Sequence, residues 1–221
     1  MNLELLLLTL PVLIFSIVVH EVAHGWVALK QGDQTALMLG RLTFNPVPHI
    51  DPIGSLLVPG LLALSGTGFI LGWARPVPVN PRNFRNYKKG DILVSLAGVT
   101  ANLILAFVFA LLLVAVLWLQ RAMPAQDAWW APMLSMFQYG VIINLVLLVF
   151  NLVPIPPLDG SHVFYYLLPP ELGARYRALG MYGMFIVLGF LMLGGFALLR
   201  PIIGAMMAVI LTVAGVFAPP A

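Results

Sequence analysis

The sequence predicts an all-α polytopic membrane protein with about five to six transmembrane helices. Of the 221 residues, 61 % are hydrophobic and only 9 % are charged, whereas a soluble domain has about 25 % charged residues. Such a chain could not cover a water-exposed surface, and its high hydrophobicity also excludes intrinsic disorder. In addition, several uncharged segments reach the length of about 20 residues that a helix needs to cross a bilayer.

Five segments are apolar and long enough to be transmembrane helices. They are Leu3–Leu29, Ile92–Leu119, Pro132–Leu158 with a continuation towards Leu168, Ala178–Leu199 and Pro201–Phe217. We expect Arg200 and Pro201 to separate the last two segments. The chain 1–221 is interpreted as a single integral-membrane domain, with a catalytic core over about 1–168 and a C-terminal helical hairpin over about 178–218.

The uncharged segment Pro52–Ala74 is ambiguous, because it is long enough to cross a membrane but rich in glycine. The basic loop Arg75–Asp91 that follows it is expected to face the cytoplasm by the positive-inside rule. Basic residues also follow the first span and precede the last hairpin. If all three basic stretches face the cytoplasm, Pro52–Ala74 must begin and end on the same side of the membrane. We therefore expect a re-entrant segment, with a helix over about Ile53–Leu64 and a short extended edge strand over Trp73–Asn80.

A polar cluster inside the first span has the spacing of a metal site. The sequence His20-Glu-Val-Ala-His24 is an H-E-x-x-H motif, and residues four apart lie one above the other on a helix face. His20 and His24 can therefore offer two imidazole nitrogens to one zinc ion about 2.0–2.1 Å away. In such motifs the glutamate, here Glu21, accepts a proton from zinc-activated water. The alternative, two core histidines beside a neutral glutamate, would desolvate three polar groups in lipid.

Asp159 is the candidate for a third zinc ligand. Catalytic zinc sites commonly have three protein ligands, and Asp159 follows three prolines that break the helix at membrane depth. The alternative is that Asp159 only caps the helix after these prolines. If 52–74 is re-entrant, His24 and Asp159 both lie roughly 10–15 Å below the cytoplasmic surface. His162 is expected to support or pack against the site.

Asn102 and Asn151 are candidates for polar contacts in the same layer. An amide can donate to a developing oxyanion or hold a substrate carbonyl. The alternative is interhelical hydrogen bonding, which small residues next to Asn102 favour.

Three blocks of this sequence resemble the site-2 protease family of intramembrane zinc metalloproteases. The blocks are His20–His24, Ala97–Asn102 and Asn151–Gly160. Their order and separation match the family's catalytic core. Two further runs, 40–45 and 72–80, are similar to a compact prokaryotic branch, and no PDZ or CBS domain is evident. Val99 and Ser161 depart from the family pattern, but neither position is a ligand.

The resemblance implies hydrolysis of peptide bonds in or near transmembrane segments of membrane-protein substrates. It implies the following roles: one zinc ion held by His20, His24 and Asp159, the catalytic carboxylate of Glu21, and substrate or oxyanion contacts by Asn102 and Asn151. We expect a multi-pass location in the cell membrane, with the active site nearer the cytoplasmic face. The expected partners are a transmembrane protein or peptide substrate and the lipid bilayer, and a homo-oligomer is left open.

Two other functions remain open at this point. An intramembrane metal-ion transporter would also place His and Asp in a membrane, although polar groups would then line the whole path. A catalytically inactive relative would bind transmembrane helices without cleaving them, although Glu21 is intact. Cysteine is absent, which excludes a Cys-ligated metal. A basic stripe with interleaved aromatic residues is also absent, which excludes nucleic-acid binding.

Overall fold

The computed structural model describes residues 3–57, 74–123 and 127–219. In these ranges the regular structure is helical and no β-strand occurs, as the all-α prediction requires. Four of the described helices are long and apolar enough to cross a membrane. They are α1 (Leu3–Gln31), α4 (Tyr87–Ala122), α5 (Asp127–Asn151) and α9 (Gly195–Gly215).

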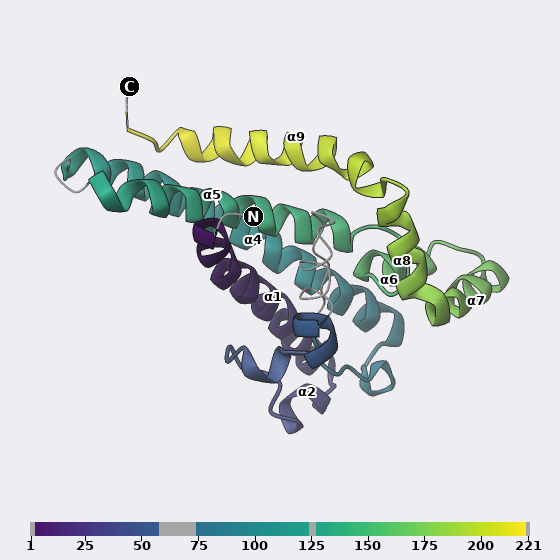
Figure 1. The fold of residues 1–221 in the computed structure, drawn as a ribbon. Coiled ribbons are helices and arrows are strands. Elements are labelled where there is room, and N and C mark those ends of the chain that lie inside the picture. Colours follow the sequence, from purple (N-terminus) through teal and green to yellow (C-terminus); the bar gives the residue numbers. More distant parts are fainter. Residues whose placement is uncertain (1–2, 58–73, 124–126, 220–221) are drawn as a thin grey trace.

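The helices α4 and α5 form a long hairpin that makes up the centre of the molecule (Figure 1). Helix α1 packs against both of them, and α9 lies along the hairpin and also contacts both of its helices. Buried side chains such as Phe109, Val141 and Leu145 fill the space between these helices. A Cβ at Gly140 would lie 2.5 Å from the Phe109 ring, so this glycine lets the ring pack directly on the α5 backbone.

Shorter elements connect the long helices. They are α2 (Thr35–Met38), η1 (Val47–His49), η2 (Pro52–Leu57), η3 (Pro81–Asn83), α6 (Asp159–Tyr165), α7 (Pro170–Ala178), η5 (Leu179–Tyr182) and α8 (Gly183–Met192). The turn of α2 and its flanking loops lie beyond one end of α1, while α6, α7 and α8 lie beside one end of the α4–α5 hairpin (Figure 1). The third span is predicted to continue to Leu158, but helix α5 ends at Asn151, before the three prolines. Helical structure begins again with α6 at Asp159.

The boundaries of the predicted C-terminal hairpin are wrong. Segment 178–199 is not one helix, because α8 ends at Met192 and Gly194 adopts a left-handed conformation with φ of 83°. Glycine populates this region without steric cost, so the chain turns there. Pro201 instead lies inside α9, about two turns after its first residue. With ten residues, α8 rises only about 15 Å and is too short to cross a bilayer.

The predicted re-entrant segment falls mostly outside the described residues. Its first residues form a π-helical turn, η2, and 58–73 are not described. The predicted edge strand is absent from the described part, 74–80, which has no regular structure. Two prolines in this segment cannot donate to a ladder, and the Val77 N–H donates to the Glu21 carboxylate rather than to another strand.

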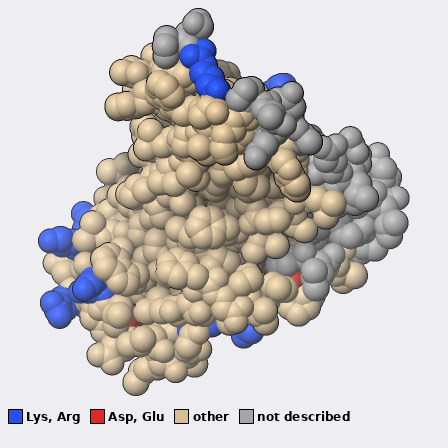
Figure 2. Space-filling model, turned by 90° about the vertical axis from the view of Figure 1, so that its left-hand side faces the viewer, with Lys and Arg blue, Asp and Glu red and all other residues tan. Residues whose placement is uncertain are grey.

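The charge distribution fits a membrane protein. Figure 2 shows Lys and Arg side chains near opposite ends of the visible face, with a broad uncharged surface between them. Many large apolar side chains on α9 are exposed, for example Leu198, Val209 and Val213. Lipid tails can solvate such side chains, and a helix that crosses a membrane satisfies its backbone polar groups within the helix.

Asp33 connects the end of α1 to the segment that reaches the candidate site. Its carboxylate, 1 % exposed, accepts hydrogen bonds from the Asn80 N–H at 2.7 Å and the Asn83 amide at 2.8 Å. It also accepts from the Thr35 N–H at 3.1 Å. Burial raises the pKa of Asp33, but the hydrogen bonds from Thr35, Asn80 and Asn83 outweigh this effect and leave the pKa below its ordinary value. A carboxylate with several donors favours its charged form.

We predict that Asp33→Asn lowers the thermal stability of the detergent-solubilised protein at neutral pH by about 1–3 kcal/mol, because a buried acceptor is lost. Since the folded-state pKa is lowered, the stabilisation is present above the unfolded pKa of about 4 and is lost as the pH falls through the folded-state value. Thermal unfolding of both proteins between pH 3 and 7 checks this. The two stabilities should converge in acid, and a difference that stays constant with pH would contradict the account.

Candidate metal centre

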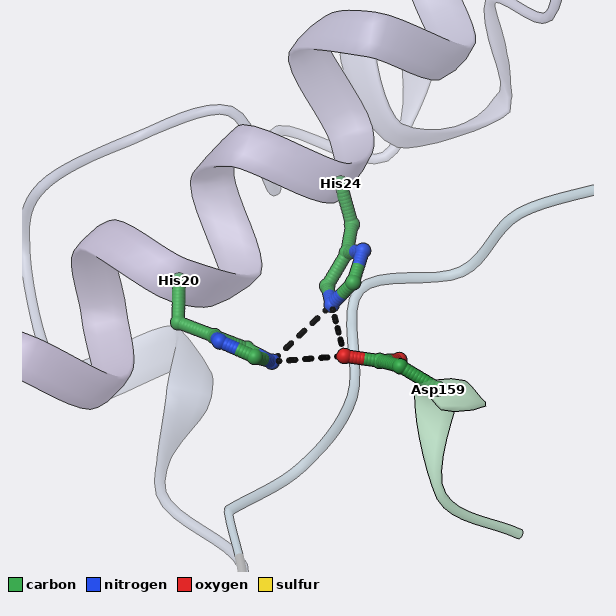
Figure 3. A group of neighbouring side chains, drawn as sticks. All are labelled: His20, His24 and Asp159. Carbon is green, nitrogen blue, oxygen red and sulfur yellow. Dashed lines mark hydrogen bonds and ion pairs between the residues drawn. The ribbon is translucent and has the colours of Figure 1, made fainter. Parts of the chain in front are cut away.

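Three polar side chains of α1 and α6 converge on one point inside the helical bundle. Figure 3 shows His20 and His24 projecting from α1 towards Asp159, the first residue of α6. The His20 and His24 Nε2 atoms are 3.0 Å apart. The Asp159 Oδ2 atom is 3.3 Å from His20 Nε2 and 3.4 Å from His24 Nε2. The structure therefore brings together all three residues that the sequence predicts as metal ligands.

These three distances match the dimensions of a zinc site. Ligand atoms about 2.0–2.1 Å from a tetrahedral zinc ion lie roughly 3.3–3.4 Å from one another. The observed separations are 3.0, 3.3 and 3.4 Å. Two nitrogens and one carboxylate oxygen are also a donor set that zinc accepts, with a fourth position left for water or substrate.

Hydrogen bonds to α4 orient both imidazole rings. His24 Nδ1 lies 2.7 Å from the Val94 main-chain carbonyl oxygen. A carbonyl only accepts, so the proton of His24 is on Nδ1 and its Nε2 carries a lone pair. His20 Nδ1 lies 2.6 Å from Asn102 Oδ1, which places the His20 proton on Nδ1 in the same way. Both Nε2 lone pairs are thus presented to the point where the three residues meet, as metal-ligating histidines require.

The surroundings of the third candidate ligand atom, Asp159 Oδ2, also fit a bound cation. Asp159 Oδ2 is buried and accepts no hydrogen bond from the described residues. It faces the lone pairs of two imidazole nitrogens, and three such electron-rich atoms repel one another unless a positive charge lies between them. A buried polar group without a partner is costly. The donor set, the spacing and the unsatisfied oxygen together fit zinc.

Gly98 of α4 leaves room for the ligand atoms. A Cβ at this position would lie 2.5 Å from His24 Nε2 and 2.6 Å from His20 Nε2. Real Cβ contacts are longer than 3.0 Å, so any side chain here would displace both rings. Gly98 belongs to the block Ala97–Asn102 that resembles the family, but residue type and spacing alone do not show that it faces the histidines.

Two contacts position α6 and with it Asp159. Gly160 lies so close to the Leu152 backbone that a Cβ would clash with the Leu152 carbonyl oxygen. At the other end of α6, the buried Asp91 carboxylate of α4 accepts a hydrogen bond from the Tyr166 hydroxyl at 2.8 Å. Asp91 also pairs with His162 Nδ1 at 3.1 Å. His162 therefore supports α6 through Asp91, in line with the expected supporting role.

Glu21 contacts the backbone of segment 74–80. Its Oε2 atom accepts a hydrogen bond of 2.7 Å from the Val77 N–H. The segment is held by the buried Arg41, whose guanidinium donates to the carbonyl oxygens of Arg75 at 2.8 Å and Pro76 at 3.2 Å. Val77 lies between two prolines, which have no N–H, so it provides the one main-chain donor of the stretch 76–78. This donor orients the Glu21 carboxylate beside the candidate metal ligands.

The two predicted asparagines have different surroundings. Asn102 is fully buried and bonds to His20 and to Asn144, which is the interhelical alternative that the sequence left open. The Asn151 amide donates to the Leu147 carbonyl oxygen of its own helix at 2.9 Å. A substrate or oxyanion contact stays a prediction for both. Asn144 belongs to no sequence motif, but in the structure it is connected to His20 through its hydrogen bond with Asn102.

Helices long and apolar enough to cross a membrane, together with an H-E-x-x-H motif that faces a carboxylate, are typical of membrane-embedded metalloproteases. Comparisons with known proteins agree with this class. A model of peptidase family M50 matches residues 116–194. A protein of Bacillus subtilis, YwhC, is 44 % identical over 188 residues, which are 84 % of this chain and 81 % of that protein.

A second relative, Rip2 of Mycolicibacterium smegmatis, is 33 % identical over 179 residues, which are 79 % of this chain and 62 % of Rip2. Both relatives carry the name "Putative zinc metalloprotease". No solved structure matches the chain. The chain belongs to peptidase family M50, the site-2 protease family, and is a zinc metalloprotease of that family.

We predict that Gly98→Ala weakens zinc binding by at least about 10–100-fold, the loss typical when the residues around a metal site are disturbed. The added methyl group displaces both Nε2 atoms. Gly204→Ala on α9 is the matched control, since a Cβ there has no atom within 4 Å. Zinc content after purification, together with competition against a chromogenic chelator, checks the prediction. Equal zinc affinity of the Gly98→Ala variant and the wild type would contradict it.

Proposed function

We propose that this protein hydrolyses peptide bonds in or near transmembrane segments of membrane-protein substrates. The observation that supports this proposal most is the convergence of His20, His24 and Asp159 on one point between membrane-spanning helices, with Glu21 beside it. A protease of this family with its ligands buried in such helices needs a substrate that reaches the same depth.

We assign one zinc ion to His20, His24 and Asp159. When bound, zinc supplies Lewis-acid chemistry that polarises a scissile carbonyl and makes a water molecule acidic at neutral pH. The protein supplies the geometry: α4 fixes both imidazoles through Val94 and Asn102, and α6 delivers the carboxylate. The site residues thereby hold the reacting groups in place before the substrate arrives, which lowers the entropic part of the barrier.

Glu21 is the proposed general base. It accepts a proton from the attacking water and transfers it to the amine of the leaving peptide. The hydrogen bond from the Val77 N–H engages one of its carboxylate oxygens, and we assign the proton transfer to the other. A helical substrate hides its carbonyl groups, so the substrate must unwind locally, and the extended segment around Val77 is where we expect an unwound strand to pair.

The orientation of the protein follows from its basic residues. Most Lys and Arg residues lie either in the segment between α1 and α4 or in α7. The positive-inside rule places such basic segments in the cytoplasm. We therefore propose a multi-pass protein of the cell membrane with its active site nearer the cytoplasmic face.

The test uses Glu21→Gln and the wild type, each reconstituted into liposomes with a single-span membrane peptide. We expect the variant to retain zinc, because Glu21 is not among the converging ligands, and to lose about 10²–10⁴-fold in cleavage rate, the usual contribution of a general base. Mass spectrometry of the peptide fragments and zinc analysis of the proteoliposomes give the two readouts.

Cleavage at the wild-type rate by Glu21→Gln would remove Glu21 from the mechanism. Zinc uptake into the liposomes by the wild type, with no cleavage of any membrane peptide, would instead identify a transporter. His24→Asn is the matched control, since it should lose both zinc and cleavage.

A further inference from the structure

A chain of fully buried polar side chains extends from the metal centre through three helices. Ser16 of α1, Asn102 of α4 and Asn144 of α5 are each 0 % exposed. The Asn102 amide nitrogen is 2.9 Å from Asn144 Oδ1. The Asn144 amide nitrogen is 2.9 Å from both the Gly140 carbonyl oxygen and Ser16 Oγ. The chain ends at His20, whose Nδ1 meets Asn102 Oδ1.

One main-chain carbonyl fixes the direction of every hydrogen bond in this chain. The Gly140 carbonyl can only accept, so the Asn144 atom that faces it is the amide nitrogen. Asn144 Oδ1 therefore points to Asn102 and must accept from the Asn102 amide nitrogen. Asn102 Oδ1 then points to His20 Nδ1 and can only accept from it. The proton of His20 is thereby held on Nδ1, and Nε2 is left with the lone pair that binds a metal.

Reversing any one of these amides would leave two like groups facing each other. If Asn102 alone turned over, its oxygen would face Asn144 Oδ1, and its nitrogen would face the His20 Nδ1–H. Both contacts would be lost in a region without exposed surface, where an unsatisfied polar group is costly. The Gly140 carbonyl fixes the orientation of the Asn144 amide, and this orientation in turn determines that Asn102 Oδ1 faces His20 Nδ1.

The two histidines depend on different kinds of support. His24 is oriented by the Val94 main-chain carbonyl, which no side-chain substitution removes. His20 is oriented by a side-chain amide that could turn over, so it needs a second group that prevents this. Ser16 does not supply the direction, because a hydroxyl rotates and can donate or accept.

We propose that Asn144 is a positioning residue for the metal centre, which fixes the Asn102 amide and through it the tautomer of the zinc ligand His20. The proposal rests on the zinc site of the proposed function. The hydrogen bonds of the Asn144 side chain go to Asn102, Ser16 and Gly140, so in this proposal it acts on His20 through Asn102. Without Asn144, the Asn102 amide turns over in part of the molecules, its nitrogen donates to His20 Nδ1, and the proton moves to Nε2, which then cannot bind zinc.

The test compares Asn144→Leu, Asn102→Leu and the double variant as full-length proteins in detergent. Zinc affinity is measured by chelator competition, and thermal unfolding of the zinc-free proteins is measured alongside. We expect Asn144→Leu to weaken zinc binding by about 10–100-fold. In the Asn102→Leu background, Asn144→Leu should cause no further loss, because a residue that acts through Asn102 has no effect in its absence.

Ser16→Ala is the matched control. It removes a buried partner of the same Asn144 amide but leaves the Gly140 carbonyl to set the direction. We expect a lower unfolding temperature and a zinc affinity within about twofold of the wild type. Wild-type zinc affinity of a folded Asn144→Leu variant would overturn the proposal, as would a loss in the double variant equal to the sum of the single losses.

A measurement on the unmutated protein keeps the proposal falsifiable if a variant fails to fold. Nitrogen NMR of ¹⁵N-histidine-labelled, zinc-free protein distinguishes the two tautomers of each ring, and His20→Asn assigns the signals. We expect His20 of the wild type to carry its proton on Nδ1, and a signal from Nε2–H would overturn the proposal. Neither readout involves peptide cleavage, so failure of this proposal and failure of the protease assignment are distinguishable.

Discussion

The hydrogen bonds that α4 accepts from the Nδ1 atoms of His20 and His24 are the interactions on which the metal centre depends. A histidine on an isolated helix can present either ring nitrogen, and only the unprotonated one binds a metal. By accepting the Nδ1 protons, α4 leaves both Nε2 atoms as ligands and fixes their spacing. The motif on α1 supplies the two imidazoles, and α4 gives them the orientation that a metal site requires.

A single face of α4 carries all of its contributions to the site. Asp91, Val94, Gly98 and Asn102 follow one another at steps of three or four residues, which places them in a row on one side of a helix. Along this row, Asp91 holds α6 through Tyr166, Val94 orients His24, Gly98 leaves the space for both rings, and Asn102 orients His20. The packing of α1 and α6 on the same helix face is therefore what brings the three ligand atoms together.

The candidate ligands are easier to predict from the sequence than the groups that support them. His20, His24 and Asp159 are recognisable because polar residues in apolar helices are rare and because three prolines mark the break before Asp159. The Val94 carbonyl belongs to the main chain and leaves no trace in residue type, and Asn144 lies 128 residues from its partner Ser16, so neither support could be found from local patterns. The sequence predicts a C-terminal break at Arg200 and Pro201, but the break occurs at Gly194. Helix α9 accommodates Pro201 near its start, and Gly194 adopts the left-handed conformation between α8 and α9.

X-ray absorption at the zinc edge tests the central claim, that α1 and α6 supply two imidazoles and one carboxylate to one metal ion. For the purified wild type we expect zinc with two imidazole nitrogens and with oxygen ligands, all about 2.0–2.1 Å from the metal. His20→Asn should reduce the imidazole count from two to one in whatever zinc it retains. An unchanged imidazole count in that variant, or wild-type zinc without any imidazole ligand, would contradict the account.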